Sequence, residues 1–138
     1  MAHEIYFDDI QVGTEMPPLV KGPMQKLQHV IYAGASGDFN PIHIDKEFAQ
    51  MVGLPSTILH GLYVMGLVAK AATDEAGGDP RALKRLSVQF RGMSMPETEI
   101  EVSGEVIEAD GSDVTFDLIA AQGENQVIRN ATADISIG

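Results

Sequence analysis

Apolar and polar residues alternate with a period of two in four stretches of the C-terminal half of the chain. Such alternation is typical of strands that bury one face and expose the other to water. Turn-forming residues separate the stretches, at positions 96–97, 110–111 and 123–125. Short links of this kind predict an antiparallel meander. The faces expected to be buried hold Leu86, Val88 and Phe90; Ile100 and Val102; Val114, Phe116, Leu118 and Ala120; and Ala131, Ala133, Ile135 and Ile137.

Residues 61–76 are apolar at almost every position up to Lys70, which predicts a long helix buried on nearly all sides. Gly77 and Gly78 follow, and glycine is common just beyond the C-terminus of a helix. The helix lacks a Ser or Asp cap directly before Gly61. Because the first N–H groups of a helix have no partner within it, we expect those near Gly61 to find one elsewhere.

Three shorter elements precede this helix. Residues 24–35 and 45–52 predict short helices, and Asp45 is placed to cap the second. Residues 14–20 predict a strand, which Pro17 and Pro18 restrict to a sheet edge. One long buried helix needs a sheet to cover it, so the pattern predicts an α+β fold. With 138 residues and no repeat or linker, residues 1–138 are expected to form one domain.

Composition excludes several classes of function. The chain has no cysteine, which rules out disulfides, zinc–thiolate sites, iron–sulfur clusters and a cysteine nucleophile. Its formal net charge is −11, so nucleic acids and anionic membranes are disfavoured as partners. The longest uncharged stretch, residues 48–69, is interrupted by Pro55 and several polar residues and is not expected to span a membrane. The acidic amino end does not have the features of a targeting peptide, so we expect a cytoplasmic protein.

The loop before the second short helix carries candidate chemistry. Pro41 prevents a continuous helix and Gly37 permits an unusual turn, so a folded loop is expected to bring Asp38 and His43 side by side. A carboxylate beside an imidazole is an acid–base pair that moves protons near neutral pH. The alternative is a plain turn, in which Asp38 caps the backbone, Asn40 and Pro41 supply turn chemistry, and His43 lies on the surface.

A longer pattern surrounds this pair. Residues 32–49 read Y-x-x-x-S-G-D-x-N-P-I-H-x-D-x-x-x-A, and His60-Gly61 follows. In these segments, and also at residues 7–13 and 87–91, the chain resembles the MaoC-like dehydratase family, which includes the (R)-specific enoyl-CoA hydratases. Two segments depart from the family pattern. Gln25 stands where Ser or Thr often caps the first helix, and residues 92–99 lack the usual Pro and Gly-Asp pair, which weakens inference about the substrate.

The resemblance implies a hot-dog fold, in which a curled antiparallel sheet wraps one long helix. It implies that Asp38 and His43 are the catalytic pair, with His43 as the base toward water and Asp38 sharing this water and supplying a proton at the α-carbon. It also implies that the Gly61 N–H binds the thioester carbonyl, although a tight packing site that needs glycine is the alternative. Asn40 is expected to hold the loop or contact the substrate, and His60 to be structural. The four histidines are scattered without metal spacing and no dinucleotide fingerprint is present, so we expect no metal and no bound cofactor, with a coenzyme A thioester as substrate.

The activity implied is that of a hydro-lyase, the reversible hydration of trans-2-enoyl thioesters to (R)-3-hydroxyacyl thioesters. The alternatives are a non-catalytic subunit of a heteromeric dehydratase and a hot-dog thioesterase. Retention of Asp38 and His43 argues against the first, and the absence of Asp and Glu from residues 61–73 argues against the second. A monomeric sheet would leave an open edge, and members of the family usually join two hot-dogs. We therefore expect a homodimer, or a heteromer with another hot-dog chain, with the site near the subunit boundary.

Overall fold

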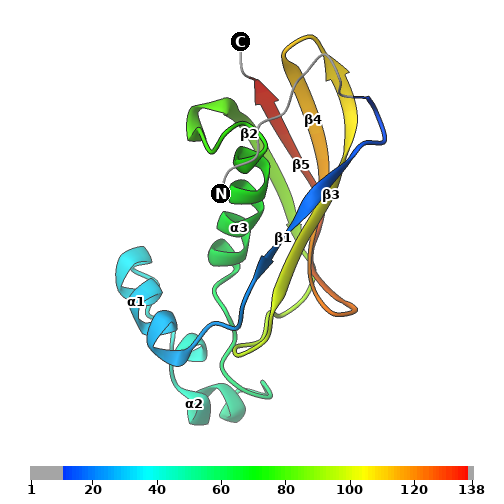
Figure 1. The fold of residues 1–138 in the computed structure, drawn as a ribbon. Coiled ribbons are helices and arrows are strands. Elements are labelled where there is room, and N and C mark those ends of the chain that lie inside the picture. The colour runs from blue at the N-terminus through cyan, green and yellow to red at the C-terminus, as the bar shows by residue number, and fades with distance from the viewer. Residues whose placement is uncertain (1–10, 137–138) are drawn as a thin grey trace.

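The computed structural model describes residues 11–136, which build a five-stranded antiparallel sheet in the order β1-β3-β4-β5-β2 (Figure 1). The long helix α3 packs against one face of this sheet and contacts β2, β3, β4 and β5. The predicted α+β class is therefore confirmed. In chain order the elements are β1 (Glu15–Lys21), α1 (Lys26–Ser36), the 3-10 helix η2 (Pro41–His43), α2 (Lys46–Met51), α3 (Gly61–Asp74), the 3-10 helix η3 (Pro80–Ala82), β2 (Leu83–Phe90), β3 (Ile100–Asp110), β4 (Asp113–Gln122) and β5 (Asn125–Ser136).

The meander is confirmed for three of the four predicted strands. β3, β4 and β5 follow one another through tight turns and pair in sequence. The prediction is wrong for β2, which pairs with β5 and not with β3. The connection between β2 and β3, residues 91–99, is long enough to cross the end of the sheet, so neighbours in sequence need not be neighbours in space.

The predicted apolar faces of β3, β4 and β5 form the core together with α3. On β2 the prediction is wrong for Phe90, whose side chain is 51% exposed. The pairing of β2 with β5 shifts register between Ser87 and Gln89, and such a bulge interrupts the alternation of faces. Ile137 lies outside the described residues. The confirmed core residues, each at most 2% exposed, are Ile100, Val102, Val114, Phe116, Leu118, Ala120, Ala131, Ala133 and Ile135.

Helix α3 begins at the predicted residue and ends two residues early, at Asp74. Gly77 and Gly78 follow with positive φ angles of 71° and 81°, as expected for residues that terminate a helix. The prediction that this helix is buried on nearly all sides is wrong. Leu62, Gly66 and Lys70 recur every fourth residue and form an exposed stripe, because the sheet covers the opposite side of the helix. None of the helices within residues 11–136 has the length and apolar character that a membrane span requires.

The two shorter helices lie beyond the N-terminal end of α3 (Figure 1). As predicted, Asp45 caps α2, and its Oδ1 accepts a hydrogen bond from the Phe48 N–H at 3.2 Å. The N-terminus of α1 is capped differently from the family pattern, because the Gln25 N–H donates a hydrogen bond to Gln28 Oε1 at 2.8 Å. β1 is an edge strand, as expected, with an irregular register around its two prolines. The loop between α1 and α2 thereby faces the start of α3.

Candidate active site

The loop that follows α1 is shaped by its own side chains. Gly37 ends the helix in the left-handed conformation, with φ of 76°, which suits glycine. Asp38 Oδ1 accepts a hydrogen bond from the Asn40 N–H at 3.2 Å. Asn40 Oδ1 in turn accepts one from the Ile42 N–H at 3.2 Å and caps η2. The turn chemistry considered for these two residues is therefore present, and it fixes the direction of the Asp38 carboxylate.

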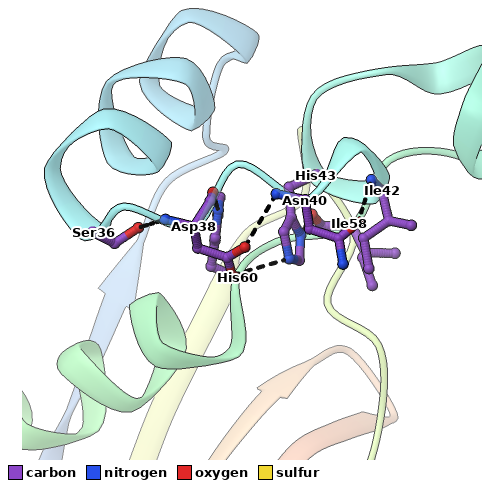
Figure 2. Close-up of polar contacts among 7 residues, drawn as sticks. All are labelled: Ser36, Asp38, Asn40, Ile42, His43, Ile58 and His60. Carbon is purple, nitrogen blue, oxygen red and sulfur yellow. Dashed lines mark hydrogen bonds and ion pairs between the residues drawn. The ribbon is translucent and has the colours of Figure 1, made fainter.

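His43 is buried against this loop and does not lie on the surface, with 8% of the residue exposed. Its Nδ1 lies 2.8 Å from the carbonyl oxygen of Ile58, and Nε2 lies 3.5 Å from Asp38 Oδ2 (Figure 2). A carbonyl oxygen only accepts, so Nδ1 carries the proton and the neutral ring keeps its lone pair on Nε2. The Asp38 side chain is 49% exposed, which leaves the space between the two groups open to water and substrate.

His60 contacts both members of this pair. Its Nε2 donates to the backbone carbonyl of Asp38 at 3.0 Å, and its ring stacks on that of His43 with centroids 3.9 Å apart (Figure 2). Tyr32, the first residue of the sequence pattern, packs against the His60 ring with 4.8 Å between ring centroids. These contacts agree with the structural role expected for His60.

Gly61 is the first residue of α3, directly after His60. The first hydrogen bonds of the helix run from the N–H groups of Tyr63 and Val64 to the His60 carbonyl, so the Gly61 N–H has no partner within the helix. A Cβ at position 61 would lie 3.2 Å from Cε1 of the Phe90 ring. Within residues 11–136 the geometry thus contains both features considered for Gly61, an N–H without a hydrogen-bond partner at a helix start and close packing.

The histidines are less scattered in space than in sequence. Asp38, His43 and His60 place one potential ligand atom each within 4.8 Å of one another. However, His43 Nδ1 and His60 Nε2 are both directed at backbone carbonyls. That pairing leaves His43 Nε2 and the Asp38 carboxylate on the open side of the cluster, an arrangement suited to holding a water molecule between an acid and a base. The absence of a metal stays a prediction.

A cavity of about 410 Å³ adjoins His43, between α1, α2 and the connection from β2 to β3. Its wall includes His29, His43, Thr57, Met95 and Glu97. Burial lowers the pKa of His29 below its usual value, and the nearby His60 and His43 lower it further. The Met24 backbone and Glu97 act in the opposite direction.

Sequence reasoning missed two groups that shape this site. The Ile58 carbonyl sets the tautomer of His43, and a backbone acceptor has no signature in a sequence. His29 entered the sequence analysis only as one of four scattered histidines, although it lines the cavity beside His43. The residues Phe7–Ile10 of the predicted amino-terminal pattern lie outside the described part of the chain.

Known proteins match most of this chain. The family model described as MaoC like domain matches residues 10–131. The peroxisomal enoyl-CoA hydratase 2 of Arabidopsis thaliana is 45% identical over 67 residues, which cover 48% of this chain and 21% of that protein. The chain spans between 4% and 38% of the length of eight curated relatives that it matches.

Solved structures agree over nearly the full chain. A MaoC-like dehydratase superposes with a TM-score of 0.89 and 30% identity, covering 99% of this chain and 43% of that one. The (R)-hydratase from A. caviae involved in PHA biosynthesis superposes with a TM-score of 0.83 and 21% identity, covering 94% of this chain and 98% of that one. The second likeness shows the fold alone. Together they confirm the hot-dog fold.

Proposed function

The chain belongs to the MaoC-like domain family, and from this premise we propose that it is a hydratase acting on trans-2-enoyl thioesters. The product would be the (R)-3-hydroxyacyl thioester, and the reverse reaction would be a dehydration. The observation that carries the proposal is the 3.5 Å approach of Asp38 Oδ2 to His43 Nε2, with His43 Nδ1 bound to the Ile58 carbonyl. This separation is long for a direct hydrogen bond. The exposed Asp38 side chain leaves room for a water molecule on the open side of the pair, in contact with both groups.

In the hydration direction, His43 Nε2 accepts a proton from this water as the water oxygen bonds to the β-carbon. In the reacting form Asp38 carries a proton and His43 is neutral. The Asp38 carboxyl group delivers its proton to the α-carbon, and both bonds form on the same face of the substrate. Transfer of the proton from His43 Nε2 back to Asp38 Oδ2 then restores the starting state of both groups. The net reaction adds one water and consumes no other reactant, so the proposed mechanism needs no redox cofactor, and none of its steps is placed on a metal ion.

The start of α3 would stabilise the charge that develops on the thioester oxygen. The Gly61 N–H lies at the positive end of a helix dipole and has no hydrogen-bond partner among the residues that the structure describes. A donor placed where negative charge grows in the transition state typically contributes about 10²–10³-fold in rate. Asn40 acts by holding the loop, since its side chain caps η2. The pair of Asp38 and His43 favours a catalytic chain over an accessory subunit.

We also propose that residues 1–138 act as one hot-dog domain that pairs with a second one. Within the described sheet, β1 and β2 each have one strand neighbour, so each presents an edge. Open edges invite pairing with another chain. The half-exposed Phe90 of β2 lies beside Gly61, which places one of these edges close to the proposed site. A homodimer is preferred, and a heteromer with another hot-dog chain is the alternative.

The decisive experiment is an assay of the purified protein against a panel of trans-2-enoyl-CoA thioesters, with chiral analysis of the product. We expect (R)-3-hydroxyacyl-CoA in the absence of added metal or cofactor. Release of free coenzyme A without hydroxyacyl product would indicate a thioesterase instead. Formation of the (S) product would contradict the proposed geometry of addition.

A further inference from the structure

Gln122, the last residue of β4, is a buried polar side chain whose hydrogen bonds lie outside the sheet. The residue is 8% exposed. Its Oε1 accepts from the Met95 N–H at 2.8 Å, and its Nε2 donates to the carbonyls of Met95 and Thr98 at 2.9 and 3.3 Å. An amide side chain offers a donor and an acceptor side by side, so it satisfies both backbone groups of Met95 at once. Gln122 thereby holds the connection between β2 and β3, residues 91–99, against the end of the sheet.

This connection in turn holds the segment that leads into α3. Ser94 lies in the connection, and its carbonyl accepts from the Leu59 N–H at 2.9 Å. Residues 54–60 form neither helix nor strand, so single hydrogen bonds of this kind decide where the segment lies. The Ile58 N–H donates to the Ile42 carbonyl at 3.1 Å on the other side. The segment therefore lies between the loop of the proposed acid–base pair and the connection.

The same segment supplies the acceptor for the proposed base. The Ile58 carbonyl lies 2.8 Å from His43 Nδ1, which leaves the lone pair of the neutral ring on Nε2, toward Asp38 (Figure 2). A neutral imidazole without this acceptor can carry its proton on either nitrogen. The form protonated on Nε2 cannot take a proton from water at that atom. The base function of His43 thus depends on the place of the Ile58 carbonyl, which the bond of the adjacent Leu59 N–H helps to fix.

We propose that Gln122 is a positioning residue, which keeps His43 in the tautomer that accepts a proton from water. It acts through two links, first its own bonds to Met95 and then the bond between Ser94 and Leu59. Coupling between separate sites is carried by contiguous networks of hydrogen bonds and packed groups. The route is shielded from solvent, since four of its residues are buried, namely Gln122, Ser94, Leu59 and His43. The inference relies on the proposed function for the role of His43.

The first test needs no turnover. Gln122→Met keeps an unbranched side chain of similar length and removes both the donor and the acceptor. The imidazole ¹⁵N shifts of His43 are measured at about pH 8, where an ordinary histidine is neutral. We expect the wild-type ring to be protonated on Nδ1 and the variant to be a mixture, with a clear share protonated on Nε2. An unchanged tautomer in the folded variant would overturn the proposal.

The second test is kinetic. We expect Gln122→Met to lower kcat about tenfold to 10²-fold with a smaller change in KM, because a misplaced base slows the chemical step. In a His43→Gln background the same change should cost little more, since residues that act as a unit are not additive. An equal loss in both backgrounds would mean that Gln122 acts apart from His43, which would also overturn the proposal.

Thr115→Val is the matched control on the same strand. It removes the hydrogen bond from Thr115 Oγ1 to Asp134 Oδ1, 2.8 Å long, which joins β4 to β5 near the other end of β4. The control should lower the unfolding free energy and leave both the His43 tautomer and kcat unchanged. The same changes in the control as in Gln122→Met would show that general loss of stability is the cause, and would overturn the proposal.

Amide hydrogen exchange of the wild-type protein replaces the variant if Gln122→Met does not fold. The Leu59 and Met95 N–H groups should then exchange through one opening, since the Leu59 acceptor moves with the connection. A Leu59 N–H that stays protected far longer than that of Met95 would overturn the proposal. A tautomer that shifts in Gln122→Met, in a protein whose wild-type form does not hydrate enoyl-CoA, would refute the proposed function and leave the link from Gln122 to His43 standing.

Discussion

The imidazole ring of His60 stacks on that of His43, with centroids 3.9 Å apart and planes inclined by 25°. The same ring donates a hydrogen bond from Nε2 to the Asp38 backbone carbonyl at 3.0 Å. One buried side chain at the start of α3 therefore contacts both members of the proposed pair. Because Gly61 follows His60 directly, His60 holds both the start of α3 and the acid–base pair in position.

His60→Phe should separate the two contacts, since it keeps an aromatic ring against His43 and removes the hydrogen bond to the loop. We expect kcat to fall by up to about 10²-fold with a smaller change in KM, because His60 acts through the position of Asp38 and not on the substrate. His60→Gln, which keeps a donor, should recover part of the rate. Steady-state kinetics of both variants, with thermal unfolding alongside, test this. Equal losses in the two variants would show that the hydrogen bond has no positioning role.

Asp38→Asn and His43→Gln should each remove activity while the fold persists. Asn keeps an oxygen that can accept from the Asn40 N–H, so the loop should survive the first change. General acid–base groups typically contribute about 10²–10⁴-fold each, and groups that act as a unit are not additive. The double variant should therefore be little slower than the slower single one. Near-normal kcat in either single variant would refute the role assigned to that residue.

Gly61→Ala distinguishes the two interpretations of Gly61. The added methyl group would meet the Phe90 ring at 3.2 Å, and because this ring is half-exposed it can shift at small cost. We expect little loss of stability and a fall in kcat/KM of about 10²-fold, because the thioester carbonyl can no longer approach the N–H closely. Gly61→Ala combined with Phe90→Leu relieves the contact. Recovery of activity in this double variant would mean that Gly61 is needed only for packing.

The assembly is tested by light scattering and by activity over a dilution series. We expect a dimer at micromolar concentrations and a specific activity that falls as the dimer dissociates, since the edge beside Gly61 would then be uncovered. A folded monomer that retains full activity on dilution would exclude the shared site. A homodimer that is folded but inactive would favour the heteromer.

Much of this fold could be predicted because local chemistry decides it. Strict alternation on β4 determines which residues face the core, and Gly37 and Pro41 favour a folded loop that brings Asp38 near His43. The failures come from relationships between distant segments. The register shift that exposes Phe90 depends on how β2 pairs with β5, and the partner of β2 depends on a connection whose path no residue type specifies.

The candidate site, too, could be predicted from the sequence only in part. The acid and the base could be identified from residue types and spacing, whereas the group that sets the His43 tautomer is a backbone carbonyl at Ile58. Apolar composition likewise predicts that α3 is buried but not that Leu62 lies on its exposed stripe, because residue type does not say which side the sheet covers. His29 gives no signal at all, since a lone histidine on a short helix is compatible with either face.

The stability of the free protein provides a last test, which concerns the buried ring of His29. His29→Leu replaces a buried polar ring by an apolar side chain of similar size, and the ring nitrogens have no hydrogen bond of normal geometry within residues 11–136. The unfolding free energy should therefore rise by about 1–3 kcal/mol near neutral pH. The folded-state pKa of His29 lies below its usual value of 6.5, because burial and the neighbouring His60 and His43 outweigh the effects of the Met24 backbone and Glu97. As the pH falls below 6.5, the unfolded wild-type chain binds a proton at His29 that the native state resists, so the wild-type protein loses stability there. The advantage of the variant should therefore widen on acidification, which urea unfolding at about pH 8 and about pH 5.5 would measure. A variant that is less stable than the wild-type protein at the higher pH would show that His29 already has a partner in the free protein.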